Sequence, residues 1–366
     1  MTSTVPRPSP ARPALTALRD RALRLAELVT TPLLPADYLD LIHPLRAGAD
    51  LRGRIEAVHR ETRDAATLVI RPGADWRPHL PGQWVRIGVE VDGVRQWRAY
   101  SLTSDLPRTD SCISITVKAI PGGRVSNHLV HRTQPGTLVH LDQATGEFVL
   151  PTPAPAKVLF VTAGSGITPV MGILRNRTDL SDVVLVHSAP AADDVVFGAE
   201  LRALAAAGRL RLVEQHTDTA GLLDAAAIAD LVPDLAERAT WACGPVGLLE
   251  ALEEHWAAAG LADRLHTERF RPTVLVPGEG GTVTFARSGT TLEADGSTPI
   301  LDAAEEAGVL MPSGCRMGIC FGCVLPLREG AVRDLRNGEL TTAAPGDGVL
   351  VQTCISAAAG ACDIDY

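Results

Sequence analysis

Four cysteines near the C-terminus constrain this chain more than any other feature of its sequence. Cys315, Cys320 and Cys323 follow the spacing C-x4-C-x2-C, and Cys354 follows further along the same segment. This is the ligand spacing of a plant-type [2Fe–2S] cluster. Glycine occurs three times in the loop, where the backbone must turn closely around the irons, at Gly314, Gly318 and Gly322. The pattern therefore predicts an iron–sulfur centre held by these four thiolates.

A structural zinc site or a set of disulfides would be the other uses of these cysteines. Zinc sites built from cysteine usually contain two C-x2-C pairs, whereas only Cys320 and Cys323 have that spacing here. Seven cysteines, four of them assigned to one site, indicate a reducing compartment rather than a disulfide framework. No signal-peptide pattern and no run of about 18 apolar residues is present. We therefore expect a cytoplasmic protein.

The net charge of −9 is spread unevenly along the chain. From Thr282 to the C-terminus there are 11 acidic and 5 basic residues. An acidic segment of this kind attracts a basic surface on a protein partner. The same negative charge argues against a nucleic-acid partner.

Residues 1–47 are expected to form an N-terminal extension with one amphipathic helix. After Pro13, apolar side chains recur at helical spacing, at Leu15, Leu18, Ala22, Leu25 and Val29. Such a helix either packs on the rest of the protein or lies on a membrane or a membrane-bound partner. Both interpretations stay open, and the second would place the protein peripherally at a membrane.

Residues 48–152 show the alternation typical of short strands, separated by Pro-Gly and Asp-Gly turns. The expected strands are 52–62, 66–71, 83–91, 94–103, 111–120 and 137–141. Six short strands within about a hundred residues predict a small antiparallel barrel.

Residues 153–271 change to apolar strands that alternate with helices, which predicts a parallel α/β domain. The expected strands are 157–163, 183–187, 210–215, 239–242 and 265–270, with helices at 170–175, 197–208, 222–231 and 246–259. Residues 272–281 are rich in proline and glycine and indicate a linker. Residues 282–366 form the cysteine-containing domain. Its expected elements are strands at 281–286, 291–294, 324–327 and 349–353 and a helix at 299–307.

Arg98, Tyr100 and Ser101 lie on one expected barrel strand. Arg98 and Tyr100 have the same parity, so both should point into one groove. A guanidinium binds a phosphate well, while an aromatic ring and the Ser101 hydroxyl suit a flavin ring. Downstream, Gly122-Gly123-Arg124-Val125-Ser126 precedes an expected helix at 127–131, whose N-terminus can bind a pyrophosphate. These residues favour a flavin site over an ordinary strand and helix cap.

The segment from Gly164 to Pro169 predicts a strand–turn–helix that binds a dinucleotide. Gly164 and Gly166 would let the backbone approach a pyrophosphate, Thr168 would cap the helix, and Pro169 would be its first residue. Cys243-Gly244-Pro245 ends another expected parallel strand, at the edge where such sheets bind ligands. Its thiol either contacts a nicotinamide or is a buried apolar group.

With these motifs, the chain resembles ferredoxin–NADP⁺ reductase-like flavoproteins fused to a C-terminal plant-type ferredoxin domain. Over roughly residues 48–366 it is similar to reductase components of multi-component oxygenases, hydroxylases and acyl desaturases. The resemblance implies a β-grasp fold for the last domain and a position near the flavin for Glu268 and Phe270. It also implies FAD at Arg98, Tyr100, Ser101, Gly123, Val125 and Ser126, NADPH or NADH at Gly164, Gly166, Thr168, Pro169, Cys243, Gly244 and Pro245, and [2Fe–2S] at Cys315, Cys320, Cys323 and Cys354.

Two positions depart from the pattern of this family. Phe321 follows the second cluster cysteine, where glycine is common in the family. The loop after the strand 183–187 has no arginine for a 2′-phosphate, but Ser188 followed by Asp193 and Asp194. We therefore expect use of both NADH and NADPH, with His216 as the better-placed donor for the phosphate.

The expected function is transfer of electrons from NAD(P)H through FAD and the cluster to an oxygenase, hydroxylase or acyl desaturase. Ser101, Cys243 and Glu268 would act at the site of hydride transfer, and the protein would be a monomer. A flavoreductase for small acceptors and a non-enzymatic redox-sensing iron–sulfur protein remain the alternatives.

Overall fold

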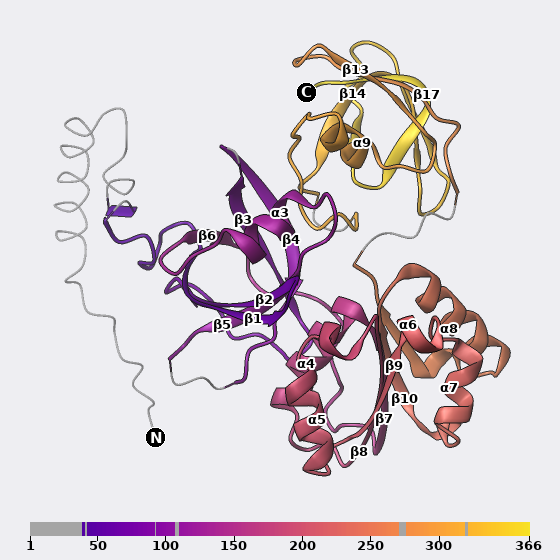
Figure 1. The fold of residues 1–366 in the computed structure, drawn as a ribbon. Helices are drawn as coiled ribbons and strands as arrows, with labels where there is room; N and C mark the ends of the chain where they lie inside the picture. The colour runs from indigo at the N-terminus through magenta and orange to yellow at the C-terminus, as the bar shows by residue number, and fades with distance from the viewer. Residues whose placement is uncertain (1–38, 41, 92, 107–109, 271–275, 319–320) are drawn as a thin grey trace, which may run out of the picture.

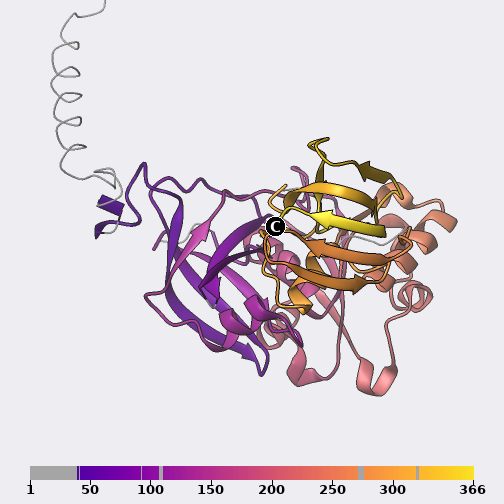
Figure 2. The same cartoon turned by 90° about the horizontal axis from the view of Figure 1, so that it is seen from above.

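The computed structural model describes residues 39–40, 42–91, 93–106, 110–270, 276–318 and 321–366. The expected N-terminal helix and the ligand Cys320 lie outside these residues. The described chain forms three units in sequence order, which Figures 1 and 2 show as a barrel, a helix-covered sheet and a smaller C-terminal domain. Within these residues no helix is long and apolar enough to cross a membrane.

The first unit confirms the expected six-stranded antiparallel barrel. Its strands are β1 (Arg52–Thr62), β2 (Ala65–Pro72), β3 (Trp84–Val91), β4 (Val94–Ser101), β5 (Ile113–Lys118) and β6 (Leu138–Leu141). They pair in the order β4-β3-β6-β1-β2-β5, and a bridge between Leu102 and Ile115 joins the two end strands. Branched apolar side chains such as Leu68, Val85 and Ile87 fill the interior and are fully buried. Burial of each contributes about 1.5–3 kcal/mol.

The second unit confirms the expected parallel α/β domain. Its sheet has the order β11-β10-β7-β8-β9, all parallel, with β7 (Lys157–Ala163), β8 (Asp182–Ala189), β9 (Arg211–His216), β10 (Ala239–Cys243) and β11 (Leu265–Glu268). Its helices are α4 (Ile167–Asn176), α5 (Gly198–Ala206), α6 (Thr217–Ala220), α7 (Ala225–Leu231) and α8 (Val246–Ala258).

Both faces of this sheet are covered, which is why its strands read as continuous apolar runs. In β7, Val158 and Phe160 pack with side chains of α4 and α5. Leu159 and Val161 point the opposite way and pack with α7 and α8 (Figure 1). The carboxyl ends of the strands consequently form one open edge, where loops can bind a ligand.

The third unit is a mixed sheet with one helix packed on it, as expected for a β-grasp domain. Its elements are β12 (Gly281–Phe285), β13 (Thr290–Ala294), α9 (Ile300–Glu306), β14 (Val324–Asp334), β15 (Leu340–Ala343), β16 (Leu350–Gln352) and β17 (Ser356–Ile364). Strand β17 is central, parallel to β12 and antiparallel to β14. Leu301 and Ala304 of α9 pack into the same core as Val283 and Ile364.

The described part of the expected linker belongs to this third unit. The Val276 amide donates to the Leu335 carbonyl at 3.3 Å, and Gly280 bridges to Ala359. Gly280 has a φ of +74°, which glycine adopts without strain. Residues 276–280 are therefore hydrogen-bonded to the C-terminal domain, and residues 272–275 of the expected linker lie outside the described residues.

Candidate functional site

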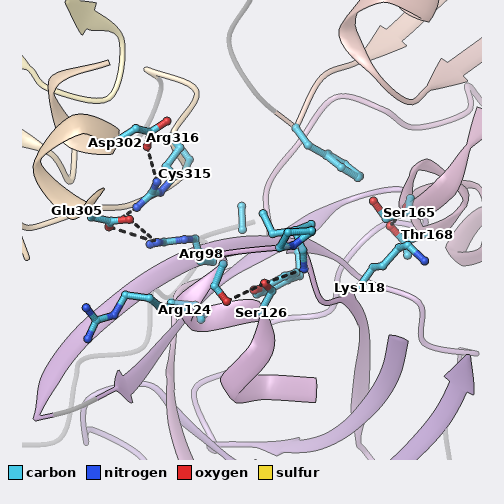
Figure 3. Close-up of a pocket in the computed structure, with 18 of the residues that line it drawn as sticks. Arg98, Lys118, Arg124, Ser126, Ser165, Thr168, Asp302, Glu305, Cys315 and Arg316 are labelled. Atoms are coloured by element: carbon cyan, nitrogen blue, oxygen red, sulfur yellow. Dashed lines mark hydrogen bonds and ion pairs between the residues drawn. The ribbon is translucent and has the colours of Figure 1, made fainter. Parts of the chain in front are cut away.

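All three units line one cavity of about 430 Å³ (Figure 3). The barrel contributes β4 and the turn before α3 (Arg124–His131), and the α/β domain contributes the turn before α4. The C-terminal domain contributes α9 and the beginning of the cysteine loop. The predicted site residues that line this cavity are Arg98, Tyr100, Ser101, Gly123, Val125, Ser126, Thr168, Phe270 and Cys315.

Strand β4 places Arg98 and Tyr100 on one face, as their shared parity predicts. Both pair across β3, Arg98 opposite Ile87 and Tyr100 opposite Val85, and both line the cavity. Burial raises the pKa of the Tyr100 phenol above its ordinary value, so its hydroxyl stays protonated. Burial and the neighbouring Arg316 lower the pKa of Arg98, although a guanidinium remains charged at any physiological pH.

Ser101 carries the clearest sign that a ligand belongs in this cavity. Its side chain is only 2% exposed, and its hydroxyl is buried without a hydrogen-bond partner among the described residues. A buried unpaired hydroxyl costs about 1–3 kcal/mol. Because the residue also lines the cavity, the hydroxyl is positioned to bond a ligand there. Together with Arg98 and Tyr100, this arrangement fits the polar edge, ring and phosphate of a flavin nucleotide.

The turn before α3 places the N-terminus of that helix at the cavity. The Ser126 hydroxyl donates to the Gly123 carbonyl and accepts from the Ile120 amide, both at 3.3 Å. A Cβ on Gly123 would lie 2.5 Å from the Ile120 side chain and from the Ser126 hydroxyl, so only glycine fits. The helix begins at Arg124 rather than at residue 127, because Gly123 already serves as its N-cap. Its N-terminus and Arg124 suit an anion.

The turn between β7 and α4 differs from the expectation in its first residues. Gly164–Gly166 form a 3₁₀ turn that continues into α4, so the helix begins at Ile167 and not at residue 170. Thr168 is therefore its second residue and Pro169 its third. The predicted capping role of Thr168 is wrong, because its hydroxyl donates to the Ser165 carbonyl at 2.9 Å.

The two glycines of this turn have different roles. Gly164 has a φ of +54° and open space where a side chain would be, which fits the close approach of a ligand. Gly166 instead packs against the chain itself, because a Cβ there would collide with the Cys243 carbonyl. Turn and strand end are thereby held together, and Gly244 and Pro245 follow at the N-terminus of α8. Of the predicted nicotinamide residues, Thr168 lines the cavity, whereas Gly164, Gly166 and Cys243 do not and form an adjacent edge.

Cys243 and Glu268 lie side by side at this edge. They are register partners of β10 and β11, and Thr162 is the partner of Cys243 on β7. Cys243 is fully buried, and its pKa is raised well above the ordinary value by burial and by Glu268. Burial raises the pKa of Glu268 to about 8, and one of its carboxyl oxygens has no partner among the described residues. A protonated carboxyl at neutral pH can donate a hydrogen bond to a ligand.

The cysteine loop gathers buried thiols. Cys315, Cys323 and Cys354 are all buried, and the Met317 amide donates to the Cys315 sulfur at 3.3 Å. A hydrogen bond with Cys323, and then burial, raise the pKa of Cys354, so the two side chains are neighbours. The Gln352 amide donates to the Gly318 carbonyl at 3.0 Å and holds the loop against β16. The described thiols and the N–H group directed at the Cys315 sulfur fit part of an iron–sulfur site. They do not form a complete ligand group by themselves, and the fourth predicted ligand, Cys320, lies outside the described residues.

Phe321, the departure noted in this loop, adopts a left-handed conformation with a φ of +55°. Its side chain is 67% exposed. The structure thus shows why glycine is suited to this position, because a non-glycine residue in that region is strained by about 1–2 kcal/mol.

Six charged residues that line the cavity were not predicted as site residues: Lys118, Arg124, Asp302, Glu305, Glu306 and Arg316. Lys118 lies on β5, a strand predicted in the sequence, but no motif marks it as a site residue. Arg124 lies within the glycine motif. Glu305 gives no local signal, because its contact with Arg98 joins two different domains. Arg316 pairs with Asp302 and Glu305 of its own domain.

Comparison with known proteins assigns each unit to a family. Residues 55–150 match the oxidoreductase FAD-binding domain, and residues 160–254 match the oxidoreductase NAD-binding domain. Residues 283–359 match the 2Fe-2S iron-sulfur cluster binding domain. The matches lie within the barrel, the α/β domain and the C-terminal domain, respectively, and support the three predicted cofactors.

Relatives are similar along nearly the whole chain. An "NADPH oxidoreductase" of Mycobacterium tuberculosis is 52% identical over 350 residues, which are 93% of this chain and 91% of the relative. The ferredoxin reductase component of the 3-ketosteroid-9-alpha-monooxygenase of Mycolicibacterium smegmatis is 32% identical, covering 76% and 86%. The solved phthalate dioxygenase reductase has the same fold, with a TM-score of 0.58 and 23% identity over 86% of this chain and 98% of that chain.

Proposed function

The chain belongs to the ferredoxin–NADP⁺ reductase-like flavoproteins with a C-terminal [2Fe–2S] domain, and we propose that its electron acceptor is a terminal oxygenase. One observation carries the electron-transfer function: a single cavity joins the predicted flavin residues, the turn before α4 and the first cluster cysteine. Relatives named as monooxygenase reductase components support an acceptor of this class. The sequence also predicts a hydroxylase or an acyl desaturase as alternative acceptors. Either can replace the oxygenase in the same assay.

The chain's own residues would hold and orient the three groups. Bound FAD would accept a hydride, which carries two electrons, and pass these electrons on singly. The cluster would carry one electron at a time. Arg98 and the N-terminus of α3 are placed to bind flavin phosphates, and Ser101 to donate a hydrogen bond to the ring. Glu268, beside Cys243, is placed to hold a proton at its carboxyl oxygen at neutral pH.

Reconstitution with a purified terminal oxygenase from the same source tests this function. We expect NADPH-dependent product formation that requires both the reductase and the oxygenase. If the chain reduces only oxygen or quinones, it is a flavoreductase instead. Flavin and cluster absorbance bands that bleach with NADPH indicate either of these two enzymes. Bound zinc without flavin would instead indicate a non-enzymatic redox-sensing protein. Scattering in the same solution tests the proposed monomer, and sedimentation with vesicles tests a peripheral membrane location.

Replacing Arg98 by alanine should weaken FAD binding. A charge-assisted contact of this kind contributes about 1.5–3 kcal/mol, so we expect a loss of about 10- to 100-fold in FAD affinity. Fluorescence titration of the apoprotein with FAD measures the effect. Arg95→Ala on the exposed end of the same strand is the matched control. Equal FAD affinity in the two variants would show that Arg98 does not bind the flavin phosphate.

The raised pKa of Glu268 predicts a specific dependence on pH. Its value in the folded protein, about 8, lies above the ordinary value of 4.5. The native state therefore holds this proton more tightly than the unfolded state, and the associated stability is lost as the pH rises towards 8. We expect Glu268→Gln to flatten this loss, which amounts to about 4 kcal/mol between pH 5 and pH 9.

The same variant should change the kinetics with pH. If the protonated carboxyl supports hydride transfer, wild-type kcat falls as the pH rises through about 8. Glu268→Gln should lack this limb, because its amide does not titrate. Denaturant unfolding and single-turnover reduction by NADPH over the same pH range measure the two effects. An identical pH limb in the variant would assign the proton to another group.

Arg202 lies near the nicotinamide edge and is a cation that was not predicted from the sequence as a phosphate ligand. It lies on α5 and donates to the Glu214 carboxylate at 2.9 Å and to the Ala192 carbonyl at 3.3 Å. It thus joins the loop after β8 to the end of β9, where a 2′-phosphate of NADPH would be bound in a sheet of this type. His216, the expected donor, lies 3.5 Å from the same Glu214 carboxylate.

We therefore expect Arg202→Ala to lower kcat/KM for NADPH by about tenfold, with little effect on NADH. Steady-state ferricyanide reduction with each nucleotide measures the ratio. Arg209→Ala, an exposed arginine beyond the end of α5, is the control. A preference for NADPH that survives Arg202→Ala would assign the phosphate to His216.

A further inference from the structure

Glu305 joins the flavin-lined barrel to the cysteine loop. It is on α9 of the C-terminal domain, and its carboxylate accepts from the Arg98 guanidinium of the barrel at 3.3 and 3.4 Å. The same carboxylate pairs with Arg316, the residue that follows Cys315. Figure 3 shows Glu305 between the two guanidiniums, with Asp302 on the far side of Arg316.

A second contact lies beside this bridge. The Ser313 hydroxyl accepts from the Arg98 guanidinium at 3.0 Å and donates to Gln96 on the same barrel strand at 3.4 Å. Ser313 and Gln96 are both buried, at 3% and 1% exposure. Ser313, two residues before Cys315, is therefore attached directly to the face of β4 that carries Tyr100, and Arg316, which follows Cys315, is attached to it through Glu305.

The charges explain why Glu305 matters most in this contact. Arg98 and Arg316 are close enough for Arg316 to lower the pKa of Arg98. Two guanidiniums from different domains repel each other unless an anion lies between them. The Glu305 side chain is 14% exposed, so water screens this charge only in part. Loss of its charge would convert an attraction between the domains into a repulsion.

We propose that Glu305 is a positioning residue that fixes the cysteine loop against the flavin-binding strand. The proposal rests on the reductase function only in that electrons pass from the barrel to the cysteine loop. Because Arg98 is also the predicted flavin phosphate ligand, domain docking and flavin binding share one side chain.

Glu305→Gln tests the proposal, because it removes the charge and keeps the shape and one acceptor oxygen. Glu329→Gln is the matched control, with the same charge change in the same domain at an exposed residue of β14. Anaerobic stopped-flow mixing of the holoprotein with NADPH resolves bleaching of flavin from bleaching of the cluster. We expect the cluster phase to slow by about tenfold in Glu305→Gln, with an unchanged flavin phase and unchanged iron content.

Small-angle scattering of the oxidised proteins gives a readout independent of turnover. We expect a larger radius of gyration for Glu305→Gln than for wild type and Glu329→Gln. Glu305→Asp, which retains the charge, should restore most of the cluster phase. If Glu305→Gln keeps both the wild-type cluster phase and the wild-type radius, the proposal is overturned. No external acceptor is present, so this result is independent of whether the acceptor is an oxygenase.

Discussion

Replacing Cys323 by serine is expected to remove the iron–sulfur cluster and leave FAD in place. Cys323 is buried beside Cys354 in the cysteine loop, and a hydroxyl is a poor ligand for iron in place of a thiolate. The predicted flavin residues lie on the barrel, and among the described residues its core and that of the C-terminal domain have none in common. We therefore expect iron and labile sulfide to fall by about tenfold or more, with FAD content unchanged.

The electron-transfer consequence should be selective. Cytochrome c and terminal oxygenase reduction should fall by about 100-fold or more, because they take electrons from the cluster. Ferricyanide reduction should remain, because flavin can supply it. Iron analysis, absorbance spectra and the two assays check this result.

Cys362→Ser is the matched control. Cys362 is also a buried cysteine of the C-terminal domain, on β17, but lies outside the four-cysteine pattern. It should retain the cluster. A Cys323→Ser protein with full iron and sulfide content would show that the ligand assignment is wrong.

Gly166→Ala is expected to disable the nicotinamide edge. A Cβ at this position would collide with the Cys243 carbonyl, and backbone cannot move aside as a flexible side chain can. Accommodation would require displacement of the Cys243–Pro245 turn away from α4. We expect the collision to cost about 2–4 kcal/mol. This cost either lowers the free energy of unfolding or, as the second possibility, is relieved by distortion of the site. In the second case kcat/KM for NADPH should fall by about 100-fold.

Reduction by dithionite separates these effects, because it bypasses the nicotinamide. The variant should still be fully reduced by dithionite, with normal FAD and iron content. Gly247→Ala is the control, since no atom lies within 4 Å of its Cβ in α8. It should be more stable by about 0.5–1 kcal/mol. Unchanged unfolding and unchanged kcat/KM in Gly166→Ala would refute the packing argument.

Local patterns were sufficient for much of the fold. The bounds of β1 and β7 agree with their predicted ranges at both ends. Alternation marked the barrel strands, and continuous apolar runs marked the strands that are covered on both faces. Central strand β17 was missed because Ser356–Ile364 is rich in alanine and glycine, which have low strand propensity. It forms because β12 and β14 pair with it on either side.

The sequence by itself determined which groups this protein is built to hold. Each motif lies within one element and its flanking residues, so it can be recognised in the sequence. This holds for the cysteine spacing, the Arg98–Ser101 motif and the glycine turns. Only the tertiary structure decided how these parts meet. Glu305, on α9, and Arg98, on β4, are 207 residues apart in sequence. Their contact depends on how two separately folded domains dock, and neither domain's local pattern encodes that arrangement.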